Sequence, residues 1–90
     1  MIARRLTISG EVQGVGFRYA LADEARARNL RGWVRNRRDG SVEAIVAGTE
    51  ADVEAVIAWA RHGPPAARVT RVAVEPAATD SAEFEIVSSA

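Results

Sequence analysis

The chain has 90 residues, a formal net charge of zero and a hydrophobic fraction of 48%, which suits one folded domain with a single modest core. Its twelve basic residues are all arginine, cysteine is absent and His62 is the only histidine. This composition excludes disulfides, thiol nucleophiles and zinc sites built by this chain alone. No stretch resembles a signal peptide or is long and apolar enough to span a bilayer, so we expect a cytoplasmic protein that does not engage a membrane.

The N-terminal third of the chain predicts a strand followed by a helix. Apolar residues alternate with polar ones at the period of a half-buried strand, and those on the buried face are Leu6, Ile8 and Val12. After a glycine turn, the apolar spacing becomes helical over residues 17–25. Asn29 then follows as a residue that tolerates the left-handed conformation at a helix end.

The middle of the chain predicts a hairpin and a second helix. Strands are expected at residues 30–36 and 41–47, because the Asp-Gly pair at positions 39 and 40 is a strong hairpin signal between two alternating segments. Thr49 can cap the following helix, whose apolar stripe consists of Val53, Val56, Ile57 and Ala60. Glycine and prolines at residues 62–65 are expected to end it.

Two more strands complete the pattern, at residues 68–75 and, after a polar connection, at residues 83–87. The order β-α-β-β-α-β with a short additional C-terminal strand is typical of the ferredoxin-like α+β class. In that class an antiparallel sheet carries both helices on one face. No linker divides the chain, so residues 1–90 are expected to form a single domain.

The segment GEVQGVGFRYA, residues 10–20, joins the first strand to the first helix. Gly14 and Gly16 let backbone N–H groups converge without side chains in the way, at a helix start whose own N–H groups are unpaired. Arg18 lies in the first turn and can add a forked positive charge. A dinucleotide fingerprint is excluded because Tyr19 replaces its third glycine, and a Walker loop is excluded because lysine is absent. The turn is therefore either an anion cradle with an arginine or a tight connection beside a solvated arginine.

Asn36 stands near the end of the second predicted strand, close to the hairpin. Its neutral amide can donate and accept hydrogen bonds at once, and so can hold a water molecule. An amide is too weak a base to deprotonate that water, so Asn36 would orient a nucleophile. The alternative is that Asn36 only shapes the hairpin, which is a common role of asparagine.

Two segments, GEVQGVGFR at residues 10–18 and GWVRNRRDGSVE at residues 32–43, resemble the acylphosphatase family. The order of strands and helices over nearly the whole chain also agrees with the ferredoxin-like fold of that family. The resemblance implies an enzyme that hydrolyses the carboxyl–phosphate anhydride of small acyl phosphates to a carboxylate and inorganic phosphate. It also implies that no metal ion or other cofactor is needed, and we expect a monomer.

Carried over by position, the resemblance implies a role for each matching residue. Arg18 would bind the phosphate, and Asn36 would orient the attacking water. Ser41 takes the place of a hydroxyl residue that supports the asparagine in the family. Backbone N–H groups of the loop would cradle the phosphoryl oxygens of the substrate, of inorganic phosphate or of a similar anion; they belong to Gln13, Gly14, Val15, Gly16 and Phe17.

Three positions depart from the family pattern or extend it. Arg37 stands where many members have a small hydroxyl residue, and it adds positive charge beside the site. Gly16 replaces a cysteine that some members carry. In some members the terminal carboxylate pairs with the phosphate-binding arginine, so the sequence leaves open whether Ala90 reaches Arg18.

Two other functions compete with this interpretation. Trp33 with Arg31 and Arg35 could form a sheet face that stacks RNA bases. However, the aromatic fraction is 6%, the net charge is zero and no aromatic-rich RNA-binding motif occurs, so no nucleic acid partner is expected. The second alternative is an accessory module without catalytic activity, since acylphosphatase-like domains also occur inside larger proteins. The start at Met1 and the short chain favour a free-standing enzyme.

His62 is the one residue that could be mistaken for a catalytic base. It lies at the predicted end of the second helix, beside Gly63. A histidine at that position commonly interacts with the negative end of the helix dipole. We therefore expect His62 to have a structural role.

Overall fold

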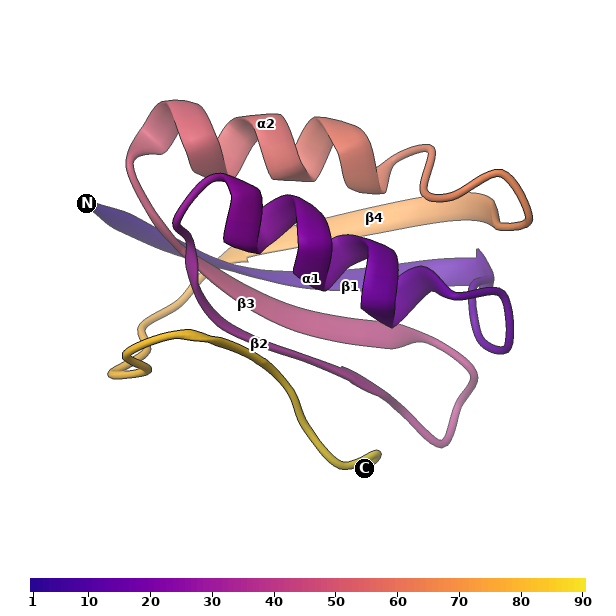
Figure 1. Cartoon of the computed structure of the whole chain (residues 1–90). Coiled ribbons are helices and arrows are strands. Elements are labelled where there is room, and N and C mark those ends of the chain that lie inside the picture. The colour runs from indigo at the N-terminus through magenta and orange to yellow at the C-terminus, as the bar shows by residue number, and fades with distance from the viewer.

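A computed structural model describes all residues from Met1 to Ala90 and contains five strands and two helices (Figure 1). In chain order they are β1 (Ile2–Glu11), α1 (Phe17–Ala27), β2 (Arg31–Asn36), β3 (Val42–Gly48), α2 (Glu50–Ala60), β4 (Arg68–Pro76) and β5 (Phe84–Ile86). Every predicted element is present, and the boundaries differ only slightly at the ends. Neither helix has the length and apolar composition that crossing a bilayer requires.

The strands form one sheet with the order β4-β1-β3-β2-β5. β1 pairs antiparallel with β3 and with β4, and β2 pairs antiparallel with β3. This arrangement confirms the predicted ferredoxin-like fold. The short last strand adds a parallel pair, β2 with β5. It runs parallel because the chain leaves β4 at the end of the sheet where β2 begins and then crosses to the free edge of β2 (Figure 1).

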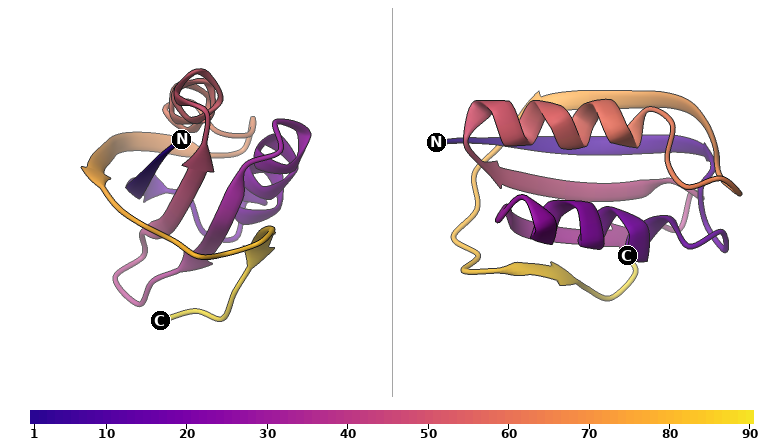
Figure 2. Two further views of the ribbon diagram at one scale, coloured as in Figure 1. Left: turned by 90° about the vertical axis from the view of Figure 1, so that its left-hand side faces the viewer. Right: turned by 45° about the horizontal axis from the view of Figure 1, so that its top comes forward.

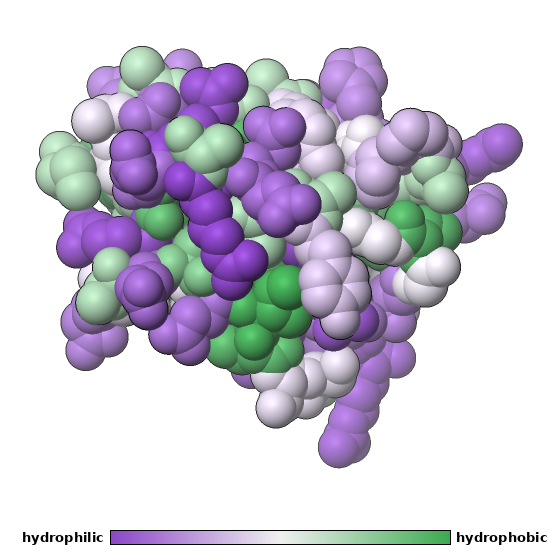
Figure 3. Space-filling view, viewed as in Figure 1, coloured by the Kyte–Doolittle hydropathy of each residue, from purple (hydrophilic) through white to green (hydrophobic).

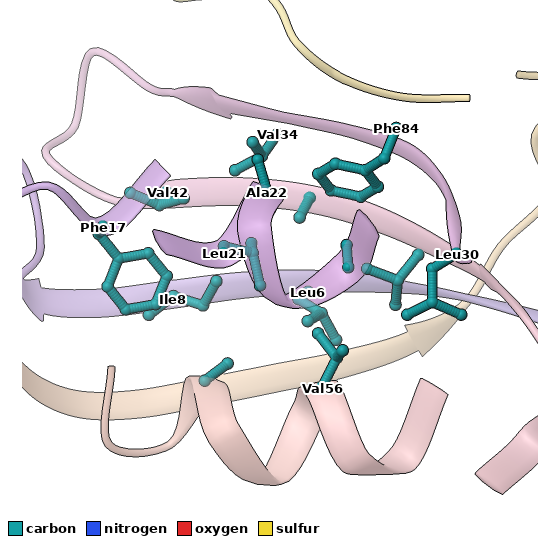
Figure 4. Close-up of a cluster of buried hydrophobic side chains, with 14 of the residues drawn as sticks. Leu6, Ile8, Phe17, Leu21, Ala22, Leu30, Val34, Val42, Val56 and Phe84 are labelled. Atoms are coloured by element: carbon teal, nitrogen blue, oxygen red, sulfur yellow. The ribbon is translucent and has the colours of Figure 1, made fainter. Parts of the chain in front are cut away.

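Both helices cover the same face of the sheet, as the two views in Figure 2 show. The buried apolar residues of β1, β2 and β3 point to this face and pack against those of α1 and α2. Figure 4 shows this core between the helices and the strands, including Leu6 and Ile8 of β1 and Leu21 of α1. These three side chains are fully buried, as the alternation and the helical spacing of the sequence predict.

Local signals in the sequence end α1 and begin α2 where they were expected. Asn29 has a φ of 57°, and the next N–H, of Leu30, donates to the Ala25 carbonyl at 2.9 Å. Helices commonly end with such a left-handed residue, followed by an N–H that donates to a carbonyl of the last helical turn. At α2 the Thr49 hydroxyl accepts a hydrogen bond from the Asp52 N–H at 3.2 Å, which confirms the predicted cap.

Three connections gather at one end of the sheet, on the right in Figure 1. They are the β1–α1 loop, the β2–β3 hairpin and the loop between α2 and β4. β1 and β2 each pair antiparallel with β3 and so run in the same direction. Their C-terminal ends, Glu11 and Asn36, therefore lie at this same end of the sheet.

The face that Figure 3 shows is mostly hydrophilic and includes smaller hydrophobic areas. Large apolar side chains with substantial exposure are limited to Met1, Tyr19 and Val74. Of these, Tyr19 belongs to the first turn of α1, next to Arg18. This places an exposed aromatic ring beside the glycine-containing loop.

Candidate active site

The loop before α1 has the backbone geometry of an anion cradle. Gly14 and Gly16 have φ angles of 73° and 81°, whereas Val15 between them does not have a positive φ. Such an alternation turns successive N–H groups toward a common point. The N–H groups of residues 13–19 donate to no acceptor in the protein, and the first helical bond is that from the Ala20 N–H to the Gly16 carbonyl, at 3.0 Å.

The first turn of α1 carries no negative charge of its own. Gly16 occupies the N-cap position, no side chain caps the helix, and its first turn has no acidic residue. The positive end of the helix dipole is therefore not neutralised by the chain itself. Arg18 in this turn is half-buried and has no acidic partner. Its guanidinium carbon lies 5.8 Å from the centre of the Tyr19 ring.

Asn36 is the last residue of β2 and pairs with Val42 across the β2–β3 hairpin. Its backbone carbonyl accepts a hydrogen bond from the Ala90 N–H at 3.0 Å. Its side-chain oxygen, Oδ1, is buried and has no hydrogen-bond partner in the protein. A buried amide oxygen without a partner costs free energy, so this atom is suited to accept a hydrogen bond from a water molecule.

Gln13 connects the loop to the hairpin through its side chain. Its Nε2 lies 2.7 Å from the Arg37 carbonyl oxygen and 3.0 Å from the Ser41 carbonyl oxygen. The resemblance implied a role only for the backbone N–H of Gln13, and the contact of its side chain was not predicted. No sequence signal identifies it, because the partners are 24 and 28 residues away along the chain.

Ser41 has a different partner from the one that the resemblance suggested. Its hydroxyl donates to Asp39 Oδ1 at 2.6 Å, and its N–H donates to the same oxygen at 2.9 Å. No hydrogen bond joins it to the Asn36 side chain. These two bonds lower the pKa of the Asp39 carboxyl below its ordinary value, the hydroxyl contributing most, and the positive charge of Arg37 adds to the effect. Ser41 therefore shapes the turn of the hairpin, because the Asp39 carboxylate lies within reach two residues earlier.

The end of the chain lies at the hairpin. The Arg38 N–H donates to the Ala90 oxygen at 2.7 Å, and the Ala90 N–H donates to the Asn36 carbonyl. No ion pair joins Ala90 to Arg18. The question that the sequence left open is thus answered, and Ala90 braces the backbone next to Asn36.

The sequence and the structure both match known acylphosphatases. The acylphosphatase family model matches residues 4–86. A protein named acylphosphatase from Burkholderia lata is 55% identical over 73 residues, which are 81% of this chain and 74% of that protein. The crystal structure of acylphosphatase from Bacillus subtilis superposes with a TM-score of 0.92 at 38% identity, over 97% of this chain and 99% of that one. This chain belongs to the acylphosphatase family.

Family membership confirms the resemblance that the two sequence segments suggested, and it supports an acylphosphatase enzyme. The same fold also matches a small part of a larger protein. In the crystal structure of full-length HypF in the phosphate- and nucleotide-bound form, the TM-score is 0.89 at 34% identity, over 98% of this chain and 12% of that chain. The acylphosphatase fold therefore occurs both as a chain of this size and within a longer one.

Both tryptophans of this acylphosphatase-type domain contact other side chains of the chain. Trp59 of α2 packs against Phe17, with 5.5 Å between the ring centres, and so covers the core beside the loop. Trp33 lies on the sheet face that the helices leave open, where the Arg35 guanidinium carbon is 4.9 Å from its ring centre. His62 follows α2 and is exposed.

The open face of the sheet contains a buried carboxylate between two arginines. Glu43 is only 3% exposed, and its oxygens lie 2.6 Å from Arg5 Nη2 and 2.8 Å from Arg35 Nε. A buried charge is tolerated when it is paired and hydrogen-bonded. Two arginines of this face are therefore engaged by the chain's own carboxylate.

One hollow in the surface lies away from the loop and the hairpin. It has a volume of about 360 Å³ and lies between α2 and the strands β1 and β4; its lining includes Ile2, Ile57, Arg61 and Val74. None of the predicted site residues lines it. No group of three or more His, Cys, Asp or Glu side chains is arranged to hold a metal ion.

Proposed function

We propose that this protein hydrolyses the carboxyl–phosphate anhydride of small acyl phosphates, using the β1–α1 loop to bind the phosphoryl group. The observation that carries the proposal is the row of N–H groups at residues 13–19 that donate to no protein acceptor, next to the unpaired Arg18. Relatives named acylphosphatase over most of the chain support the same reaction. The proposal includes a single-domain, cytoplasmic monomer that acts without a cofactor.

Binding and transition-state stabilisation fall to the loop and Arg18. The converging N–H groups donate to the phosphoryl oxygens, and the guanidinium supplies a fixed positive charge with a forked pair of donors. Phosphoryl transfer passes through a loose transition state whose charge is spread over these oxygens. Donors that are already in place stabilise that charge without reorganising.

Asn36 would hold the attacking water. Its unpartnered Oδ1 accepts a hydrogen bond from the water, so that the water oxygen faces the phosphorus. The bond between phosphorus and the bridging oxygen breaks as the new P–O bond forms, and the acyl group leaves as a carboxylate. Because a carboxylate is a good leaving group and an amide is a weak base, the proton of the water passes to a phosphoryl oxygen.

The first experiment is hydrolysis of benzoyl phosphate by the purified protein with a metal chelator present. We expect turnover by the natural sequence. In Asn36→Ala we expect kcat to fall by about 100-fold, while the inhibition constant of inorganic phosphate stays the same, because the loop and Arg18 still bind the anion. Asn29→Gly is the matched control, because it removes the other asparagine of the chain. Asn29 has a left-handed backbone conformation, which glycine tolerates.

Two outcomes would contradict the proposal. Absence of turnover by folded protein of the natural sequence would exclude the hydrolytic function and favour an accessory module. Equal loss of phosphate inhibition in Asn36→Ala and in an Arg18 variant would contradict the separate roles of the two residues. Folding of each variant is checked by circular dichroism and thermal unfolding.

A further inference from the structure

We propose that the side-chain amide of Gln13 is a positioning group that holds the phosphate-binding loop against the β2–β3 hairpin. In this role it sets where the water held by Asn36 lies relative to the bound phosphoryl group. The inference rests on the proposed function and adds a residue that acts through Asn36 without touching the substrate with its side chain.

The geometry of the amide leaves one orientation. Nε2 of Gln13 is within hydrogen-bond distance of two carbonyl oxygens, at 2.7 Å from Arg37 and 3.0 Å from Ser41. An amide nitrogen carries two N–H donors, whereas the amide oxygen carries none. Both bonds can therefore form at once, and only the nitrogen end can face the pair of carbonyls.

These two bonds join parts of the chain that the sheet does not join. Pairing between β1 and β3 ends at Ile8 with Val42, and the remaining residues of β1 pair only with β4. No other hydrogen bond links residues 12–18 to residues 36–41. Without the Gln13 amide, no hydrogen bond would join the loop to the hairpin beyond the end of the sheet.

Gln13 also connects the two parts of the proposed chemistry over a short path. Its own backbone N–H belongs to the unpaired row of the loop. Its side chain binds the carbonyl of Arg37, the residue that directly follows Asn36. A displacement of about 1 Å between reacting groups can cost about 100-fold in rate, so a fixed spacer at this point affects the position of the attacking water.

The hairpin itself does not depend on this amide. The Arg37 carbonyl also accepts from the Gly40 N–H at 3.1 Å, and the Ser41 carbonyl also accepts from the Arg37 N–H at 2.9 Å. Removing the Gln13 side chain therefore leaves neither carbonyl without a donor. We expect the hairpin to keep its conformation when the Gln13 side chain is removed. The substitution should therefore lower kcat more than it lowers the free energy of unfolding.

The test is Gln13→Met, which keeps the length of the side chain and removes both donors. With benzoyl phosphate we expect kcat to fall by about tenfold or more, while KM and the inhibition constant of inorganic phosphate stay nearly unchanged. Arg26→Met is the matched control, because Arg26 also donates two side-chain hydrogen bonds to a carbonyl, that of Phe84, at 3.2 and 3.0 Å. That control lies in the last turn of α1, and we expect it to leave kcat unchanged.

A double variant separates positioning from general weakening of the structure. If Gln13 acts through Asn36, Gln13→Met should lower kcat much less in an Asn36→Ala background than in the natural sequence. The same factor in both backgrounds would overturn the proposal, and so would a kcat of Gln13→Met equal to that of the natural sequence.

A second measurement does not depend on activity. NMR relaxation of the backbone amides of residues 37–41 should show greater mobility in Gln13→Met than in the natural sequence. Equal mobility would overturn the proposed clamp whatever the kinetics show. Absence of turnover by the natural sequence would instead contradict the proposed function, so the two failures can be told apart.

Discussion

The two helices of this domain begin in opposite ways. At α2 the Thr49 hydroxyl accepts from the Asp52 N–H at 3.2 Å and donates to the Asp52 carboxylate at 2.9 Å, and Glu50 adds another acidic side chain. At α1 the N-cap is Gly16, with no side-chain cap and no acidic residue in the first turn. The chain thus neutralises the positive end of the α2 dipole and leaves that of α1 open beside Arg18.

This difference separates a helix start that serves stability from one that can receive an anion. A side-chain cap contributes about 1 kcal/mol, and α1 forgoes it. In exchange, the N–H groups of residues 13–19 remain free to donate. Both helices have the same dipole, so the dipole alone does not mark the site. The free N–H groups, the left-handed glycines and the unpaired arginine together distinguish α1.

Removing the arginine should have the largest effect. In Arg18→Met we expect kcat/KM for benzoyl phosphate to fall by at least about 1000-fold, because a fixed donor to the transition-state charge is lost. Inhibition by inorganic phosphate should be lost with it. Arg28→Met is the control at the other end of α1, where the arginine faces Asp52 at 3.6 Å and contributes little. Phosphate inhibition that survives in Arg18→Met would contradict the role of the loop and arginine.

Giving α1 the acidic start of α2 should close its site. In Gly16→Asp a carboxylate would stand at the N-cap, and Gly16→Asn would have the same shape and the same backbone strain without the charge. We expect phosphate to bind at least about tenfold more weakly to the Asp variant than to the Asn variant. Phosphate inhibition constants at low and high salt measure this, and the gap should narrow as salt rises. Equal constants in the two variants would show that the helix start does not bind the anion.

Removing the cap of α2 should affect stability and leave activity alone. In Thr49→Ala we expect the free energy of unfolding, measured in urea, to fall by about 1 kcal/mol because the Asp52 N–H loses its partner. The kcat/KM of the folded protein should not change. A loss of activity without a loss of stability would mean that the two helix starts are not functionally distinct.

The smallest expected effect concerns Asp39. Like Asp52, it has a carboxylate that accepts a hydrogen bond from a nearby hydroxyl of the chain. Hydrogen bonds from Ser41 lower its pKa below the ordinary 3.8 in the folded protein. The stability that it contributes is therefore present above pH 3.8 and is lost as pH falls through the lowered folded-state pKa. Relative to Asp39→Asn, the natural sequence should be more stable at neutral pH, and the difference should shrink in acid. An NMR titration that gives Asp39 an ordinary pKa would contradict this.

Much of the fold could be predicted from the sequence because its signals are local. The alternation in β1, the helical spacing in α1 and α2, and the end of α1 at Asn29 all depend on residues that are close along the chain. The candidate loop was found for the same reason, since its glycines and Arg18 are adjacent in sequence. The parallel direction of β5 was not predicted, because it depends on which edge of the sheet the chain reaches.

The sequence by itself determined the elements, their order, the glycine turn before α1 and the capped start of α2. Only the tertiary structure decided that the Gln13 amide binds the hairpin and that Asn36 Oδ1 is buried without a partner. Periodicity and capping act between near neighbours in the chain and can be recognised there. The Gln13 contact and the burial of Asn36 instead depend on sheet register and packing, which bring segments together that the sequence keeps far apart.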